Sequence, residues 1–540
     1  GGVSELAWSP DGNRIAYVTR LAVPDDPFID PSDPAPSAIS IIRRLVYKTD
    51  REGYWDGRWN HIVILSMPDD AFGLIGHPGL ATKSTQVTSG PYDHQHVSWS
   101  PCGRSVAFVA NRTSDWDITE NRDVWLAELN EDTSQLKQLT SLGGPASRPS
   151  WSPDGTRVAF LGHDRSAEAV TNTQLWVVSV TTPKEIRCLT RDFDRSIEDC
   201  IIGDANVNVP QTAPVWNPTG RRIWVLATDG SSTHVFSIAT ERTSSNYRTA
   251  PDTGVILGVR STLPEESTSV TREIFGERHI LRFVPSADFR KIFLIVSTPN
   301  VPSDVWLWQK RKERRLTDIN HALLGERVLN EPDRLLFDVE DGIKIEGWLI
   351  HPRNPQEKPH PLVVHVHRGR FGNTFGIEFQ LLASAGFAVL YVNCRGGYGY
   401  GQAFRAAIHY APLTVECRDI LAAVKTVIDR PDIDESRVGV TGTSYGGKLT
   451  TWFLATTNLF RAGISRASIS NQYSNWGSND RGYLRWAPVG TPWDSADFYL
   501  QASPITLVDR ISAPLLLLHG DRDFRCSLEQ SEKLCALMEE

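Results

Sequence analysis

The sequence predicts two domains, an N-terminal all-β propeller over residues 1–330 and a C-terminal α/β domain over residues 331–540. A length of 540 residues exceeds what a single hydrophobic core usually supports. One tryptophan-containing phrase recurs through the first three fifths of the chain, which is typical of a repeat fold. In the last two fifths, apolar runs alternate with helical patterns, which is typical of a mostly parallel sheet.

The repeated phrase is Trp-Ser-Pro-Asp-Gly followed by a β-branched and aromatic run. Copies begin at Trp8, Trp99, Trp151 and Trp216, and a degenerate copy begins at Val284. Proline presets φ in the turn and glycine takes the position that needs positive φ, so each copy predicts two strands joined by a turn. Further strands follow each copy, giving about four short strands per repeat, which favours a propeller of about five to seven complete or partial blades over a β-sandwich. We expect the tryptophans to pack between blades rather than to stack on a ligand.

Residues 21–54 interrupt this rhythm. Residues 24–34 are rich in proline and aspartate and indicate a loop, whereas residues 39–47 are compatible with a helix or a strand. We interpret the segment as an insertion within a blade. Long insertions of this kind are often functional, so it is expected to reach over an active site.

The C-terminal domain contains a Gly-x-Ser-x-Gly phrase centred on Ser444. An apolar run at 438–441 precedes it and a helical pattern at 448–456 follows it. A strand, a glycine-flanked serine and a helix form the nucleophile turn of α/β-hydrolases, because only glycine lets strand and helix approach so closely. The alternative is a helix start with chance glycines. The sequence therefore predicts an α/β-hydrolase domain with Ser444 as its nucleophile.

Asp523 follows the apolar strand that ends at His519 and is the candidate for the acid, with Asp521 as a weaker one. Its role would be to orient an imidazole and stabilise the charged form of that ring. The alternative for Asp523 is a helix N-cap or a surface ion pair. The chain order of α/β-hydrolases is serine, acid, histidine, and Asp523 follows Ser444 as the acid does in that order.

The histidine that should follow the acid is missing. The chain runs from His519 to Glu540 without another histidine, and His365, His367 and His409 all precede the serine. A serine hydroxyl without a base is a weak nucleophile. We therefore expect either that the sequence is cut before its histidine or that the protein is not a working hydrolase. The last helical pattern stops while still periodic, which favours truncation.

The composition of the chain argues against some classes of binding partner. A net charge of −8 and a pI near 6 argue against a nucleic-acid or anionic-membrane surface, and no apolar run reaches the ~20 residues of a membrane span. The seven cysteines are scattered without a Cys-x-x-Cys pair, which indicates neither a disulfide framework nor a zinc site. No signal peptide is visible at the start. We expect a cytoplasmic protein without cofactor or metal, and the oligomeric state stays open.

Taken together, the repeats and the serine phrase make the chain resemble the prolyl oligopeptidase family of serine peptidases, near its acylaminoacyl-peptidase and dipeptidyl-aminopeptidase-like branch. The matching phrases lie at 391–396, 399–401, 444–447, 503–504 and 519–523. The resemblance implies that Ser444 is the nucleophile, that Asp523 is the triad acid and that the backbone N–H of Tyr445 contributes to the oxyanion hole. It also implies a triad histidine beyond Glu540 and a chain truncated at both ends.

Three departures from the family pattern concern the oxyanion hole and its surroundings. The family's His-Gly-Gly-Pro phrase is replaced at 365–369, its Trp-Gly-Gly phrase is replaced at 411–414, and the tyrosine after the two glycines is Lys448. The leading hypothesis is a serine peptidase acting on short peptides. The rival is a catalytically inactive family member whose propeller is a binding scaffold. A carboxylesterase would share the triad but gives no reason for the propeller.

Overall fold

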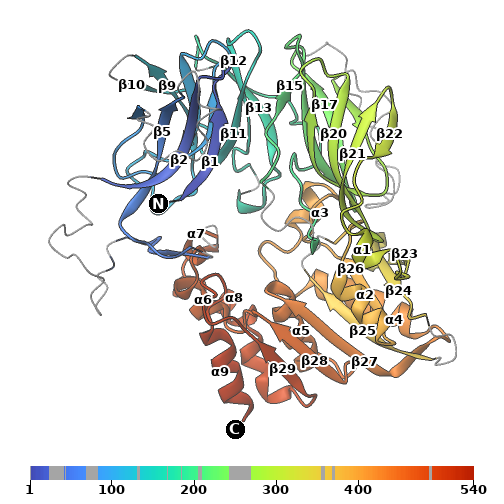
Figure 1. Cartoon of the computed structure of the whole chain (residues 1–540). Helices are drawn as coiled ribbons and strands as arrows, with labels where there is room; N and C mark the ends of the chain where they lie inside the picture. Colours follow the sequence, from blue (N-terminus) through green and yellow to red (C-terminus); the bar gives the residue numbers. More distant parts are fainter. Residues whose placement is uncertain are drawn as a thin grey trace.

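The computed structural model divides the molecule into a set of twisted antiparallel sheets and an α/β domain below them (Figure 1). It describes residues 2–23, 42, 44–50, 52–67, 83–130, 134–166, 168–183, 185–204, 210–241, 269–353, 359–367, 371–485 and 489–539. In this part of the chain, no helix is long and apolar enough to cross a membrane.

Each copy of the repeated phrase joins the first strand of a four-strand group to the second strand. The first sheet holds β1 (Val3–Trp8), β2 (Arg14–Ala22), β5 (Arg58–Ser66) and β6 (Ser84–Gln86); the second holds β7 (His94–Trp99), β8 (Ser105–Ala110), β9 (Asp123–Leu129) and β10 (Ser134–Gln138); the third holds β11 (Ala146–Trp151), β12 (Arg157–Gly162), β13 (Gln174–Ser179) and β14 (Ile186–Cys188). The next strands are β15 (Val215–Trp216), β16 (Arg222–Asp229), β17 (Ser232–Ala239) and β18 (Val270–Ile274), then β19 (His279–Pro285), β20 (Lys291–Thr298), β21 (Val301–Gln309) and β22 (Lys312–Arg315). A single parallel pairing of Thr233 with His279 joins these last two groups into one sheet. The number of blades stays a prediction.

The tryptophans of the repeat join neighbouring sheets. The indole N–H of Trp99 donates to the carbonyl of Ala7 over 3.0 Å, and that of Trp151 donates to Ser98 over 3.1 Å. The indole of Trp216 continues the series by donating to Ser150 over 3.0 Å. Each repeat therefore bonds to the first strand of the repeat before it, and the prediction that tryptophans lie between sheets is confirmed.

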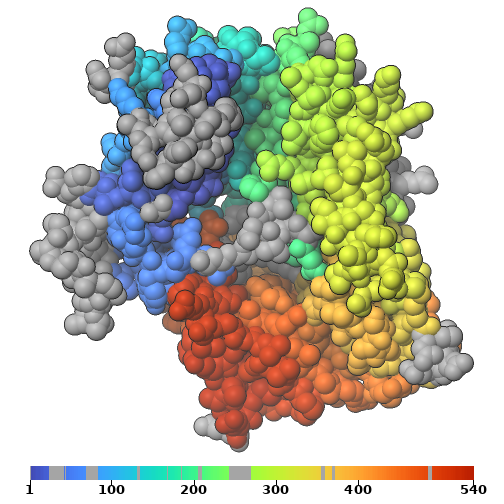
Figure 2. All heavy atoms as spheres, in the orientation of Figure 1, coloured from blue at the N-terminus to red at the C-terminus, as the bar shows by residue number. Residues whose placement is uncertain are grey.

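The insertion between β2 and β5 contacts the second domain. Its described part contains the hairpin of β3 (Lys48–Thr49) and β4 (Gly53–Tyr54). The Lys48 ammonium donates to the carbonyl of Ser478 over 2.8 Å, and the Tyr54 ring lies edge-on to Phe524 with 5.3 Å between centroids. The expectations for residues 24–41 lie outside the described residues. Figure 2 shows the contact between the two domains on the surface, where blue N-terminal atoms lie against the red C-terminal segment.

A seven-stranded sheet forms the centre of the α/β-hydrolase domain, in the order β23-β24-β26-β25-β27-β28-β29. Its strands are β23 (Pro332–Asp338), β24 (Lys344–Ile350), β25 (His360–Val366), β26 (Ala388–Asn393), β27 (Ile433–Thr443), β28 (Ala462–Arg466) and β29 (Leu515–Leu518), and the five from β26 to β29 pair in parallel. The helices are α1 (His321–Leu324), α2 (Ile377–Ser384), α3 (Gln402–Ala406), α4 (Val415–Ile428), α5 (Tyr445–Thr456), α6 (Gln472–Ser478), α7 (Gly482–Arg485), α8 (Ala496–Gln501) and α9 (Glu529–Met538). Leu362, Val364 and Val440 of the central strands are buried with the apolar sides of α4 and α5 in the largest core cluster. Burial of these strands explains their continuous apolar runs.

The two domains also meet on the side of α3. The guanidinium of Arg405 donates to the carbonyl of Thr171 over 2.9 Å, and the backbone N–H of Gln402 donates to Asp194 over 2.7 Å. Nearer the sheet of β19, the buried His279 ring bridges Asp199 at 2.8 Å and Thr374 at 3.0 Å. These contacts, together with those of the β3–β4 hairpin, hold the propeller over the carboxyl ends of the parallel strands, where the sites of open α/β sheets lie.

Candidate active site

Ser444 occupies a sharp turn between β27 and α5. Its φ of +59° and ψ of −117° are strained for a residue with a side chain. A Cβ on Gly442 would lie 2.5 Å from the carbonyl oxygen of Val366, and one on Gly446 would lie 2.2 Å from the same atom. The two flanking glycines are therefore required by the close passage of β25, which is the crowding that the phrase predicts. The helix begins at Tyr445 rather than at residue 448, because the turn leads directly into α5.

Backbone bonds hold the strained turn in place. The N–H of Ser444 donates to the carbonyl of Arg466 on β28 over 2.9 Å, and its carbonyl accepts from the N–H of Lys448 over 3.1 Å. The side chain is left half-buried rather than enclosed in the core. Its Oγ atom lies 3.7 Å from Sγ of Cys526. The hydroxyl is thus held at the carboxyl end of the sheet, facing the loop that follows β29.

Asp523 lies in that loop, between β29 and α9. Its Oδ1 atom accepts backbone N–H bonds from Arg525 over 3.0 Å and from Cys526 over 2.7 Å. Since the thiol of Cys526 also contacts Ser444, both sequence-predicted side chains contact the same cysteine. The Asp523 side chain is 19% exposed, so its carboxylate is not sealed into the core.

His519, the one histidine near Asp523, already has two other partners. Its Nδ1 atom lies 2.7 Å from the hydroxyl of Ser531, its Nε2 atom lies 2.6 Å from the carbonyl of Cys526, and Nε2 is 3.8 Å from Asp523. In the part of the chain that the structure describes, no histidine forms a hydrogen bond with Ser444. Both ring nitrogens of His519 support the loop, which agrees with its assignment as a strand-end residue rather than as the base.

Tyr445 is the first residue of α5, where backbone N–H groups have no partner within the helix and the helix dipole is positive. Its phenol donates to Oε1 of Glu416 over 2.7 Å. Glu416, which is 1% exposed, also accepts the backbone N–H groups of Leu413 and Thr414. A buried carboxylate therefore fixes the side chain of Tyr445. Sequence reasoning missed Glu416, because only its place at the start of a helical pattern was visible.

The segment that replaces the family's glycine-rich phrase ends β25. His365 lies 3.2 Å from the guanidinium of Arg466, which pairs with Glu378 over 2.9 Å. Burial acts to raise the pKa of Glu378, but hydrogen bonds from His365 and Arg466 outweigh it and lower the pKa to about 2. Residues 368 and 369 of the phrase lie outside the described residues.

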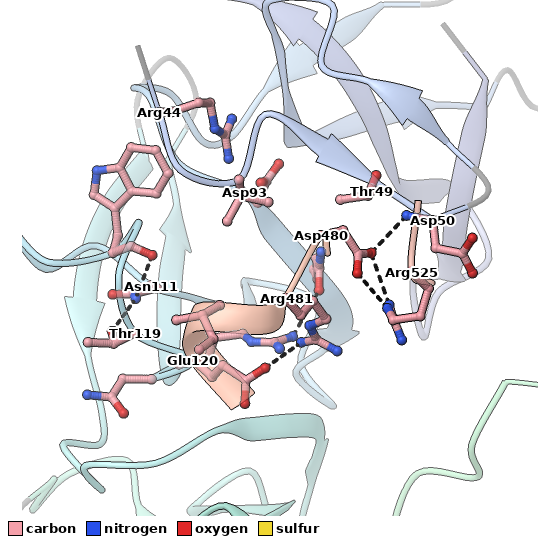
Figure 3. Close-up of a pocket in the computed structure, with 16 residues that line it drawn as sticks. Arg44, Thr49, Asp50, Asp93, Asn111, Thr119, Glu120, Asp480, Arg481 and Arg525 are labelled. Atoms are coloured by element: carbon pink, nitrogen blue, oxygen red, sulfur yellow. Dashed lines mark hydrogen bonds and ion pairs between the residues drawn. The ribbon is translucent and has the colours of Figure 1, made fainter. Parts of the chain in front are cut away.

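A cavity of about 330 Å³ lies between the domains (Figure 3). It lies beside the loop between β29 and α9 that carries Asp523, which we call the acid loop. Asp480 links its walls, because it accepts from Arg525 over 2.5 Å and from the backbone N–H of Asp50 over 2.9 Å. Arg481 pairs with Glu120 of the propeller over 2.9 Å. Arg525 is two residues from Asp523 in the same loop, although neither Ser444 nor Asp523 lines the cavity. Nothing in the sequence pattern marks these pairs, since each joins segments far apart in the chain.

Known proteins share this arrangement. The profile of the prolyl oligopeptidase family matches residues 373–540. The uncharacterized peptidase YuxL of Bacillus subtilis is 30% identical over 545 residues, covering 99% of this chain and 76% of that protein. Dipeptidyl-peptidase 5 of Porphyromonas gingivalis is 22% identical over 562 residues, covering 98% of this chain and 73% of the relative.

Solved structures agree on the fold. The uncomplexed acylaminoacyl peptidase of Pyrococcus horikoshii superposes with a TM-score of 0.75 at 20% identity, covering 100% of this chain and 75% of that one. An acylaminoacyl peptidase in complex with Z-Gly-Gly-Phe-chloromethyl ketone gives the same TM-score of 0.75 and covers 99% of this chain and 75% of that one. Because a relative that is 30% identical matches 99% of this chain and 76% of its own length, the chain belongs to the prolyl oligopeptidase family.

Proposed function

We propose that the protein is a serine peptidase that hydrolyses short peptides by acyl transfer to Ser444 and then to water. The observation that carries the proposal is the pairing of a strained, half-buried serine with the acid loop across Cys526. Strain at a nucleophile turn persists only where the surrounding structure enforces it, and here Val366 and Arg466 do so. The peptidase names of the relatives support the same reaction class.

Each residue has a distinct role in the proposed reaction. Ser444 attacks the scissile carbonyl, and the backbone N–H of Tyr445 stabilises the oxyanion at the positive end of α5. Asp523, whose Oδ1 is occupied by two N–H groups, presents Oδ2 to orient an imidazole. The base of the proposed triad is a histidine that this sequence does not contain. It takes the serine proton and returns it to the leaving amine.

Short peptides are the proposed substrates because the propeller covers the site. The cavity between the domains has a volume of about 330 Å³, near the lower end for small-ligand sites. The β3–β4 hairpin, held by Lys48 and Tyr54, closes one side of it. The names dipeptidyl-peptidase and acylaminoacyl peptidase, carried by relatives and structural neighbours, favour substrates of this size.

Labelling with a fluorophosphonate tests the nucleophile. The intact gene product should be labelled once, and Ser444→Ala should abolish the label. Thr443→Ala, one residue before the nucleophile and exposed, is a matched control that should label normally. Absence of labelling in a folded preparation with its complete natural C-terminus would end the peptidase proposal.

A catalytically inactive binding protein is the second candidate. It is favoured by the engagement of both nitrogens of His519 and by the replaced phrases at 365–369 and 411–414. The reading frame past Glu540 discriminates the two, because the peptidase needs a histidine there. Hydrolysis of a peptide amide rather than only an ester would also separate the peptidase from a carboxylesterase.

We also propose a cytoplasmic location. The seven cysteines of the sequence are scattered, with no Cys-x-x-Cys pair, which suits a reducing compartment. Fractionation of the source cells with an antibody against the protein tests this location directly.

A further inference from the structure

A second cavity, of about 260 Å³, adjoins the propeller side of the interdomain cavity. Arg122, which precedes β9, lines both of them. The second cavity is bounded by the first strands of successive propeller sheets, including His96 of β7 and Arg148 of β11. Arg122 therefore stands between the cavity beside the acid loop and the cavity within the propeller.

Arg122 is a partly buried cation without an anionic partner. Among the described residues, no carboxylate lies within ion-pair distance of its guanidinium, and its side chain donates only to Oε1 of Gln95 over a long 3.4 Å. Burial, and secondly the nearby charge of Arg481, lower the pKa of Arg122. The two acidic neighbours are already engaged, since Glu120 pairs with Arg481 and Asp93 accepts the backbone and side-chain N–H groups of Asn60. A cation kept from water without a counter-ion is unfavourable, and such groups are commonly found where a ligand supplies the missing charge.

Arg148 reaches the same cavity through a feature of the repeat. In β1, β7 and β11 the pairing register shifts just before the tryptophan, as it does at β-bulges. The residue three positions before each tryptophan is Glu5, His96 or Arg148, and the latter two have positive φ values of 59° and 54°. These equivalent side chains converge, because Glu5 accepts the backbone N–H of His96 over 2.6 Å and His96 lines the cavity with Arg148.

The other lining groups leave the positive charge uncompensated. Burial, and then the charges of Arg148 and Arg122, lower the pKa of His96 to about 3, so the ring is neutral at pH 7. Its Nδ1 atom has no hydrogen-bond partner in the described part of the chain. Glu198 also lines the cavity, but its Oε1 accepts the hydroxyls of Thr173 over 2.9 Å and Ser196 over 2.6 Å. Two guanidiniums therefore line the cavity with one carboxylate, Glu198, and the charge of Glu5 that acts on Arg148 comes from a carboxylate that accepts the N–H of His96.

We infer that Arg122 and Arg148 form a subsite for a carboxylate group of a bound peptide. The carboxylate is either an acidic side chain or the C-terminal α-carboxylate, because a guanidinium binds both in the same bidentate way. The inference rests on the proposed function only in taking the ligand to be a peptide. A peptide with its reactive carbonyl at Ser444 extends through the interdomain cavity and places its charge at Arg122.

Binding to the intact chain carrying Ser444→Ala tests the subsite without any turnover. Dye-labelled peptides of equal length are compared by fluorescence anisotropy at fixed ionic strength. In the first pair, both peptides have an amidated C-terminus and differ only in a Glu or a Gln residue. In the second pair, both peptides have neutral side chains and differ only in a free or an amidated C-terminus. At least one carboxylate peptide should bind about tenfold more tightly than its neutral partner, as a charge-assisted bond predicts. The pair that shows the difference identifies the source of the carboxylate.

Substitutions show whether the preference for the carboxylate peptide arises at the second cavity. Arg122→Met and Arg148→Met should each remove most of the preference, whereas Arg290→Met, which removes an exposed charge on the last propeller sheet, should keep it. Equal binding of both members of both pairs would overturn the inference. So would a preference that survives both cavity variants, since it would then arise elsewhere on the surface.

Thermal unfolding gives a second readout that separates a binding role from a structural one. Without peptide, Arg122→Met should melt at or above the wild-type temperature, because an unpaired cation is replaced by an apolar side chain of similar length. With the preferred peptide, wild type should gain stability and the variant should not. A strongly destabilised Arg122→Met would show a structural arginine and contradict the subsite. Loss of fluorophosphonate labelling in the wild type would overturn the peptidase proposal while leaving these binding results unaffected.

Discussion

Oγ of Ser444 lies 3.7 Å from Sγ of Cys526, whose backbone N–H donates to Oδ1 of Asp523 over 2.7 Å. One buried residue therefore sets the spacing between the candidate nucleophile and the candidate acid. Cys526 is 2% exposed, so a larger side chain at this position would have to displace its neighbours. The geometry of the site depends on the size of this side chain as well as on the two polar groups.

Enlarging Cys526 should therefore impair the nucleophile. Cys526→Leu overpacks a closed site and should slow fluorophosphonate labelling of Ser444 about tenfold, because the acid loop is pushed from the serine. Cys526→Ala keeps the backbone bond to Asp523 and should label at close to the normal rate. Cys535→Leu, at an exposed position of α9, serves as the control for the added volume. Normal labelling of Cys526→Leu would show that the spacing is not critical.

Gly446→Ala should destabilise the domain, because its Cβ would lie 2.2 Å from the carbonyl oxygen of Val366. We expect a loss of about 1–3 kcal/mol in the free energy of unfolding. Gly477→Ala is the matched control, since a Cβ there meets nothing within 4 Å inside the helix α6. Chemical unfolding should show that variant to be unchanged or more stable by up to about 1 kcal/mol. Equal stability of the two variants would argue against the crowded turn.

Tyr445→Phe should weaken the support of the proposed oxyanion residue. The change leaves buried Glu416 without the phenol it accepts at 2.7 Å, at a cost of about 1–3 kcal/mol in unfolding free energy. Glu416→Gln keeps the shape but turns one acceptor oxygen into an NH2 group against a backbone N–H, so it should cost at least as much. Tyr473→Phe, at an exposed phenol on α6, is the control. Urea titrations of the variants give the comparison, and a neutral Tyr445→Phe would contradict a structural role for this bond.

Asp480 should couple the propeller to the acid loop. Asp480→Asn keeps the volume of the side chain but removes the charge that Arg525 contacts at 2.5 Å. Because Arg525 is partly exposed, we expect the loss of this buried pair to cost about 3 kcal/mol at most in the free energy of unfolding. We expect faster proteolysis of the segment near β3 and β4 and slower labelling of Ser444. Asp494→Asn, at an exposed site before α8, should change neither. Unchanged proteolysis and labelling in Asp480→Asn would show that the β3–β4 hairpin does not influence the candidate site.

Local patterns accounted for the parts of the molecule that short segments determine. The tryptophan phrase predicted the repeated sheets, and the glycines around Ser444 predicted the turn, since each acts through its immediate neighbours. The start of α5 was placed three residues too late because two glycines weaken any helical pattern. Glu416 and Asp480 could not be found, because each forms its bonds with residues that only the tertiary fold brings near.

Acid should destabilise the propeller through its buried histidines. Burial is the main reason that the pKa of His94 is lowered from 6.5 to about 3, and the ring is fully buried with Nδ1 3.0 Å from the carbonyl of Asn60. The unfolded chain binds the proton near pH 6.5 and the folded chain only near pH 3, so this contribution is complete above pH 6.5 and is lost as the pH falls towards 3. Between pH 7 and pH 4 it amounts to about 3 kcal/mol.

The measurement is the free energy of unfolding in urea at several pH values across this window. His94→Gln cannot take up the proton, so it should flatten the pH dependence although it lowers the stability at pH 7 by removing a packed ring. His321→Gln, with a side chain 75% exposed on α1, should keep the wild-type dependence. Since the pKa of His61, against the same ring at 5.2 Å, is lowered to about 4 mainly by burial, the double variant should be flatter than His94→Gln alone. A wild-type slope retained in both variants would place the acid-sensitive groups elsewhere in the fold.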